Sequence, residues 1–159
     1  MNRLLRQTKQ HAQGSVAVEF AVLLPIMVVM LAVPLLFGRV FWHYTVAQKA
    51  SQDAVRFLAA ANAAEIKTPG AGGTEAPIAA VARAIVLAEI AELNPGPYRP
   101  VVDVLCDGRT CAGFLIPQKV TVGVTMPILD DLFSGITSDI TGGYPIVLNP
   151  AATTSYVGN

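Results

Sequence analysis

The chain contains little charge for its length. Lys, Arg, Asp and Glu make up 14% of its 159 residues, whereas about 25% is usual for a soluble globular domain. Positive and negative charges cancel to a net charge of zero, so no overall field favours a strongly charged partner. The basic residues are also too few and too scattered for a nucleic-acid-binding surface, and we expect no nucleic acid among its partners.

Histidine is equally scarce, which argues against catalysis and metal binding. The only two are His11 and His43, so no serine or cysteine nucleophile in the later chain has a nearby histidine base. The adjacent carboxylates Asp130 and Asp131 would suit acid–base work or a cation, but we expect them in a solvated loop or at a helix start. The glycines at 70, 72 and 73 lack the strand and the Lys-Ser/Thr of a phosphate-binding loop. We therefore expect no enzyme, no metal and no cofactor.

What the chain has in excess is apolar residues, at 53% of the total with a mean hydropathy of +0.51. Residues 15–38 read SVAVEFAVLLPIMVVMLAVPLLFG, with Glu19 as their only charge. A helix of this length crosses the roughly 30 Å hydrocarbon layer of a bilayer. A buried core helix is the alternative, but such helices usually keep a polar face and this run has none. Pro25 and Pro34 are tolerated in a membrane helix as mild kinks.

The flanks of this run predict its orientation. Three basic residues and no acid precede it: Arg3, Arg6 and Lys9. The positive-inside rule then keeps the N-terminus in the cytoplasm and places everything after Arg39 outside. Rings that favour the membrane interface follow at once: Trp42, His43 and Tyr44. We do not expect a removable signal peptide, because its apolar core would be shorter and a small-x-small cleavage site would follow.

Glu19 lies inside the apolar run, where an ionised carboxylate costs a few kcal/mol at the centre and less near an end. A position close to the headgroups would explain it without any function. Its context is more specific: a basic leader, then Gly14, then Ser15-Val16-Ala17-Val18-Glu19-Phe20, then the apolar helix. This order resembles type IV prepilins, and residues 10–60 resemble TadE-like proteins, pseudopilins of tight-adherence (Tad) pili.

The resemblance implies that a prepilin peptidase cuts between Gly14 and Ser15, and that Glu19 and Phe20 set the assembly register. It also implies partners: the peptidase, other pilin-like subunits and an inner-membrane assembly platform, besides membrane lipid. The protein would then be a minor pseudopilin of the inner membrane, with a role in adhesion and the possibility of entering the extracellular pilus. In the assembled state, the new α-amino group of Ser15 would pair with Glu19 of a neighbouring subunit.

Beyond the membrane, the residues predict a small α+β domain. Helical spacing continues through residues 39–67 as an amphipathic extension, so one helix is expected from about Ser15 to Ala64. A Gly/Pro linker at 68–77 follows, and a second helix at 78–93 has Pro77 in its first turn and Thr74 as a candidate cap. Strands are expected at 101–106, 111–116 and 119–126, with 144–157 returning as an edge strand.

The only cysteines, Cys106 and Cys111, flank the expected hairpin turn at residues 107–110. Such positions allow two cysteines to bridge, and an extracytoplasmic location permits it, so we predict a disulfide.

The expected organisation is a leader at 1–14, a transmembrane helix at 15–38, its extension at 39–67, the linker at 68–77 and an extracytoplasmic domain at 78–159. The fold class is α+β and pilin-like: a long helix, a second helix and a small antiparallel sheet. Two other functions remain open. One is an uncleaved single-pass protein whose outer domain binds a ligand, and the other is a membrane-tethered hydrolase that uses Asp130 and Asp131.

Overall fold

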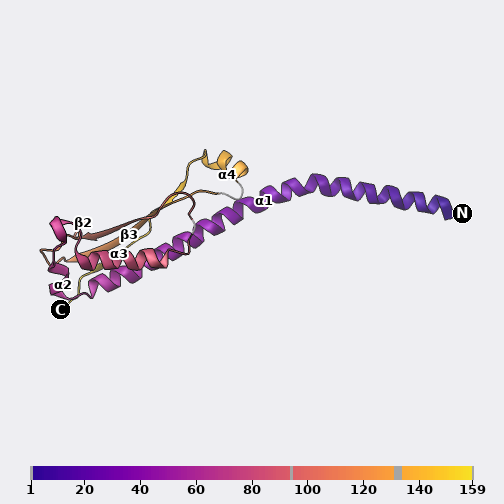
Figure 1. The fold of residues 1–159 in the computed structure, drawn as a ribbon. Helices are drawn as coiled ribbons and strands as arrows, with labels where there is room; N and C mark the ends of the chain where they lie inside the picture. The colour runs from indigo at the N-terminus through magenta and orange to yellow at the C-terminus, as the bar shows by residue number, and fades with distance from the viewer. Residues whose placement is uncertain (1, 94, 131–133, 159) are drawn as a thin grey trace.

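The computed structural model describes residues 2–93, 95–130 and 134–158 (Figure 1). One helix, α1 (Asn2–Ala59), extends along the whole molecule. Its first half projects alone, and its second half packs against a small two-layer domain, which we call the head (Figure 1). This is the expected α+β architecture, in which a long apolar N-terminal helix precedes further helices and a small antiparallel sheet.

Both ends of α1 differ from the prediction. The helix begins at Asn2, so the leader boundary at Gly14 is no break in the backbone. It ends at Ala59 rather than Ala64, and a separate short helix, α2 (Ala63–Lys67), follows. The reason is Asn62, whose side chain accepts a hydrogen bond from the Ala64 amide at 2.8 Å. Such a capping asparagine adopts an extended backbone and therefore starts a new helix instead of continuing the old one.

The linker is an ordered connection that contains a short 3₁₀ turn, η1 (Ala71–Gly73). Helix α3 (Pro77–Glu89) then begins with Pro77 in its first turn, as expected. The capping residue is Ala76, which makes no side-chain bond, so the prediction of Thr74 as the cap was wrong. The helix also stops at Glu89, before the expected 93. Its buried face presents Ala79, Ala82 and Val86.

The sheet is antiparallel and contains five strands: β1 (Val101–Cys106), β2 (Arg109–Thr110), β3 (Lys119–Ile128), β4 (Ile146–Leu148) and β5 (Ala151–Ser155). The central strand is β3, with β1 on one side and β5 and β4 on the other, and the short β2 pairs with the outer edge of β1. The expected strand at 144–157 is thus two strands that share one register, since Met126 faces Leu148 and Gly123 faces Ala151. Pro150 separates them because proline has no amide proton to donate to the ladder.

The expected strand at 111–116 is absent: β2 stops at Thr110, and the chain then bends away. Gly113 and Phe114 both have positive φ, at 89° and 76°, which is incompatible with a strand. Gly113 also lies so close to the linker that a Cβ atom there would be 2.7 Å from the Pro69 Cα. Packing against the linker therefore overrides the local strand pattern.

The core lies between the sheet and the two helices that cover one of its faces. Alternate side chains of β3 point into it and are fully or almost fully buried: Val120, Val122, Val124, Met126 and Ile128. Helices α1 and α3 pack against each other, and small residues of both are fully buried, including Ala50, Ala54 and Ala82. A last helix, α4 (Ser134–Thr141), lies beside the middle of α1 at the border between its free and packed halves (Figure 1).

Candidate functional site

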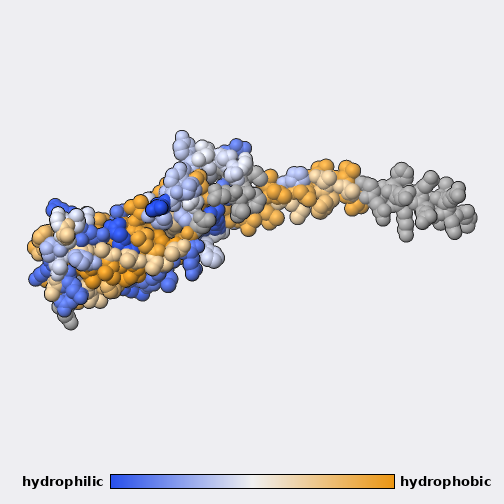
Figure 2. All heavy atoms as spheres, viewed as in Figure 1, coloured by the Kyte–Doolittle hydropathy of each residue, from blue (hydrophilic) through white to orange (hydrophobic). Residues whose placement is uncertain are grey.

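The free part of α1 is the most unusual surface of the molecule. Every residue from 16 to 31 is exposed, and large apolar side chains such as Val16, Phe20 and Met30 are 65%, 59% and 74% accessible. Figure 2 shows this stretch as a nearly continuous hydrophobic cylinder, in contrast to the mixed surface of the head. Among the described residues, α1 is the one helix long and apolar enough to cross a membrane, with its candidate span at Val16–Ala59.

The predicted cleavage and register residues all lie on this helix. Gly14 and Ser15 are in helical backbone, and Glu19 follows one turn after Ser15. Residues four apart share a helix face, so the backbone of Ser15 and the side chain of Glu19 lie on the same side of α1. Glu19 is exposed, as is the neighbouring Phe20. The described part of the head therefore leaves this face available for contacts with lipid or with another chain.

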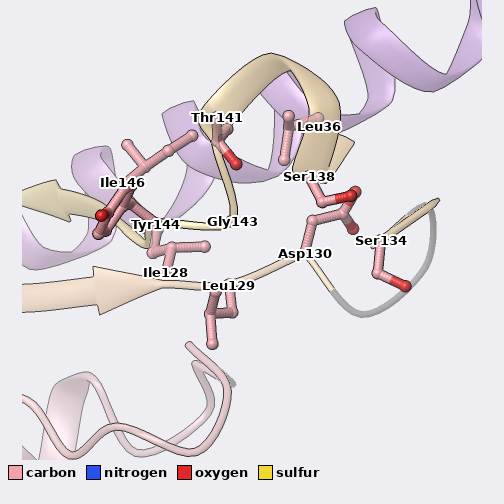
Figure 3. Close-up of a pocket in the computed structure, with 10 residues that line it drawn as sticks. All are labelled: Leu36, Ile128, Leu129, Asp130, Ser134, Ser138, Thr141, Gly143, Tyr144 and Ile146. Carbon is pink, nitrogen blue, oxygen red and sulfur yellow. The ribbon is translucent and has the colours of Figure 1, made fainter. Parts of the chain in front are cut away.

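The free half of α1 ends where α4 and the end of β3 approach it. Ala32 is fully buried, and Leu36 is 6% exposed. Leu36 lines a cavity of about 240 Å³ together with residues of β3, α4, β4 and their connections, among them Ile128, Ser138 and Tyr144 (Figure 3). Two residues that the sequence assigned to the transmembrane run thus contact the head.

An ion pair spans the same border. The Arg39 guanidinium lies 4.0 Å from the Asp130 carboxylate, and the Asp130 side chain is only 7% exposed. The expectation that Asp130 lies in a solvated loop was therefore wrong, because contact with α1 removes it from water. Asp131 lies outside the described residues. Sequence reasoning missed this pair, because nothing in the spacing of two residues so far apart indicates that they meet.

The rings after Arg39 divide between two environments. Trp42 and Tyr44 are 64% and 42% exposed, as expected for interface residues, but His43 is only 6% exposed. The Nδ1 atom of His43 lies 2.7 Å from the carbonyl oxygen of Arg39, one helical turn earlier. His43 thus faces the head, and its inclusion among the interface rings was wrong: its position on the helix turns it inward.

The cysteines lie at the opposite end of the head from the free helix. Cys106 and Cys111 are at disulfide distance, with their Cα atoms 4.9 Å apart. Asp107 and Gly108 form the turn between them, with positive φ at both positions, as a tight hairpin requires. The Asp107 carboxylate accepts hydrogen bonds from the amides of Gln118 and Lys119, at 3.1 and 2.8 Å. The turn is therefore held to the start of β3 as well as by the cysteine pair.

A side chain of α3 also contacts the backbone of β1. The Arg83 guanidinium of α3 donates to the carbonyl oxygen of Val102 and forms an ion pair with Glu75 at 2.8 Å. This contact joins the linker, α3 and β1. Within residues 2–93, 95–130 and 134–158, no group of three or more His, Cys, Asp and Glu side chains is placed to hold a metal ion.

Comparison with known protein families identifies the N-terminal part of the chain. Residues 14–56 match the family described as TadE-like protein. Comparisons with curated proteins and with solved structures give no match. The matched region begins at Gly14 and covers the free half of α1 and most of its packed half. The family suggests a membrane protein associated with the Tad pilus, and the match confirms the predicted similarity of residues 14–56, with Glu19 and the apolar run, to TadE-like proteins.

Proposed function

We propose that this protein is a minor pseudopilin of a Tad-type pilus, made as a precursor, cut after Gly14 and built into or beneath an adhesive fibre. The observation that supports this most is that the family match, which begins at Gly14, includes residues 16–31, the stretch of α1 that no described part of the head covers. Before assembly the protein resides in the inner membrane, with its N-terminus in the cytoplasm and its head outside. Its partners are a prepilin peptidase, other pilin-like subunits and the inner-membrane assembly platform.

The exposed apolar surface of residues 16–31 requires an apolar environment both before assembly, in the membrane, and after assembly, in the pilus. In the membrane, lipid provides it; after assembly, the equivalent helices of neighbouring subunits do. An apolar helix that is uniform all round can pack against neighbours on several sides at once. The exposed ring of Phe20 would contribute to this contact directly.

Glu19 supplies the specificity that a uniform apolar surface lacks. Cleavage after Gly14 would create a positive α-amino group on Ser15, close to the level of Glu19. Pairing between this cation and the Glu19 carboxylate of a neighbouring subunit would reduce the cost of holding both charges in an apolar environment. Because such a pair forms at only one axial offset, it would also set the register between subunits.

Processing is tested by intact mass and N-terminal sequencing of the protein recovered from its native membrane. A mature chain that starts at Ser15 is the expected result. A chain that keeps Arg3, Arg6 and Lys9 in a host with an active cognate peptidase would contradict the proposal and favour the plain single-pass anchor.

The register role is tested by Glu19→Ala, with Val18→Ala as the matched control on the same exposed turn. We expect both variants to insert into the membrane, since removing a charge or a few methyl groups does not shorten the apolar run. Only Glu19→Ala should lose incorporation into pili, measured as pilus-associated protein in sheared fractions. Normal incorporation of Glu19→Ala would refute the register role while leaving the membrane anchor intact.

We further propose that the head is structural rather than catalytic. Asp130, half of the candidate acid–base pair, is held against Arg39 at the border with α1. A carboxylate engaged in this way supports the packing of the head on the helix, which is what an assembly subunit needs.

A further inference from the structure

The proposed membrane anchor leads to a conclusion about the head, because the two overlap along α1. The stretch at 16–31 that stands clear of the head is roughly 24 Å long at about 1.5 Å per residue. This is shorter than the roughly 30 Å of a hydrocarbon layer. A span that starts at Val16 reaches full thickness only near Leu36, which the head already covers.

The span cannot be moved toward the cytoplasm to avoid this overlap. The residues before Ser15 include Arg3, Arg6 and Lys9, and the polar residues Gln10, His11 and Gln13 follow them. Placing these in hydrocarbon would be costly. If Glu19 lies at the inner boundary instead, the outer boundary moves to about residue 40, and the head enters more deeply. Helix tilt has the same effect, since it reduces the depth gained per residue.

The chemistry of the head at this level fits the interface rather than the hydrocarbon. The described side chains of α4 carry hydroxyl groups and one acid: Ser134, Ser138, Asp139 and Thr141. Beside them Tyr144 is 77% exposed, and tyrosine is enriched where one end of the ring is apolar and the other is in contact with water. Figure 3 shows Tyr144 and Ser138 around the same cavity as Leu36 of α1, so these groups are at the depth of the end of the span.

We propose that the membrane-proximal edge of the head, formed by α4 and Tyr144, rests in the headgroup layer of the outer leaflet of the bilayer. The protein would then contact lipid at two places more than a hundred residues apart in sequence, α1 and the α4 region. Residues 129–146 contain no lysine or arginine. Contact at this edge therefore depends on interfacial partition of the tyrosine ring and hydroxyl groups, with no requirement for anionic lipid. This inference rests on the proposed anchoring of α1.

The test uses tryptophan fluorescence of the full chain in phosphatidylcholine vesicles that contain brominated lipid. Trp42 is the only tryptophan and reports on the anchor itself. Tyr144→Trp in a Trp42→Phe background reports on the membrane-proximal edge of the head. Phe114→Trp in the same background is the matched control, because Phe114 is also exposed, at 62%, but lies at the far end of the head. Its backbone amide there donates a hydrogen bond to the carbonyl oxygen of Lys67 in α2.

We expect lipid bromine to quench the tryptophan at 144 about as strongly as Trp42, with a comparable blue shift, and to leave the tryptophan at 114 unquenched. The quenching at 144 should not change when part of the phosphatidylcholine is replaced by anionic phosphatidylglycerol. Quenching of Trp42 without quenching at 144 would overturn this inference and leave the anchor in place. Absence of quenching at both positions, together with failure to float with the vesicles, would overturn the anchor and with it the inference.

Discussion

In the first half of α1 every residue from 16 to 31 is exposed, whereas Ala47, Ala50 and Ala54 in the second half are fully buried. The exposed half carries the larger and more apolar side chains, so side-chain hydrophobicity does not predict which part of this helix is buried in the chain's own fold. The pattern does. The first half is apolar on every side and suits a surrounding apolar solvent, while the second half has one apolar stripe and suits a single packed face.

Residue size differs between the halves for a related reason. Small side chains in the second half allow α3 to approach closely, and Ala79 and Ala82 of α3 are also fully buried. The bulky residues of the first half have no partner of fixed shape to match within the described chain. The same helix therefore combines a segment whose side chains suit an apolar surrounding with a segment whose side chains suit close packing on α3.

The largest expected effect comes from the same truncation made in each half. Leu58 is fully buried, and Leu24 is 45% exposed. We expect Leu58→Ala to lower the free energy of unfolding of the head by about 2–5 kcal/mol, because it leaves a cavity in the core. Leu24→Ala should leave that free energy unchanged. Denaturant titration in detergent, followed by near-ultraviolet circular dichroism, measures both, and equal losses would show that the halves are not energetically distinct.

A smaller effect is expected at the end of the head far from the free helix. If Cys106 and Cys111 are oxidised, replacing both with serine should lower head stability by about 2 kcal/mol, since the closed loop is short. The loss should match that of the wild-type protein in reductant, and reductant should not affect the double variant further. Membrane insertion should be unaffected, because the pair lies away from α1. Stability that is insensitive to reductant would show that the cysteines are not bonded.

The smallest effect is expected at the border between the halves. Arg39→Ala removes the partner of Asp130 at a distance of 4.0 Å, and the Arg39 side chain is 21% exposed. Solvent screening limits the expected loss to about 1 kcal/mol. Because the pair links α1 to the end of β3, we expect this loss as faster hydrogen exchange in α4 and around Leu129, while β1 stays protected. Uniformly faster exchange throughout the head would show that the pair supports the whole fold.

Most elements of the fold were predictable where one local signal dominated. The apolar run at 15–38, the proline in the first turn of α3 and the alternating pattern of β3 each follow from short-range pattern. The errors arose where a contact distant in sequence prevailed. Residues 111–116 have strand composition, but close packing of Gly113 on Pro69 imposes a different backbone. His43 has the ring of an interface residue, but its place on the helix directs it into the head.

The amino-acid sequence by itself determined the apolar helix, its basic leader, the position of Glu19 after Gly14 and the TadE-like character of residues 14–56. These are properties of adjacent residues, and no folding is needed to create them. Only the tertiary structure decided where the head meets the helix: Ala32 and Leu36 are covered, Asp130 lies against Arg39, and Tyr144 is held beside the end of the span. Those contacts join residues about a hundred positions apart, and their geometry exists only once the sheet has packed on α1.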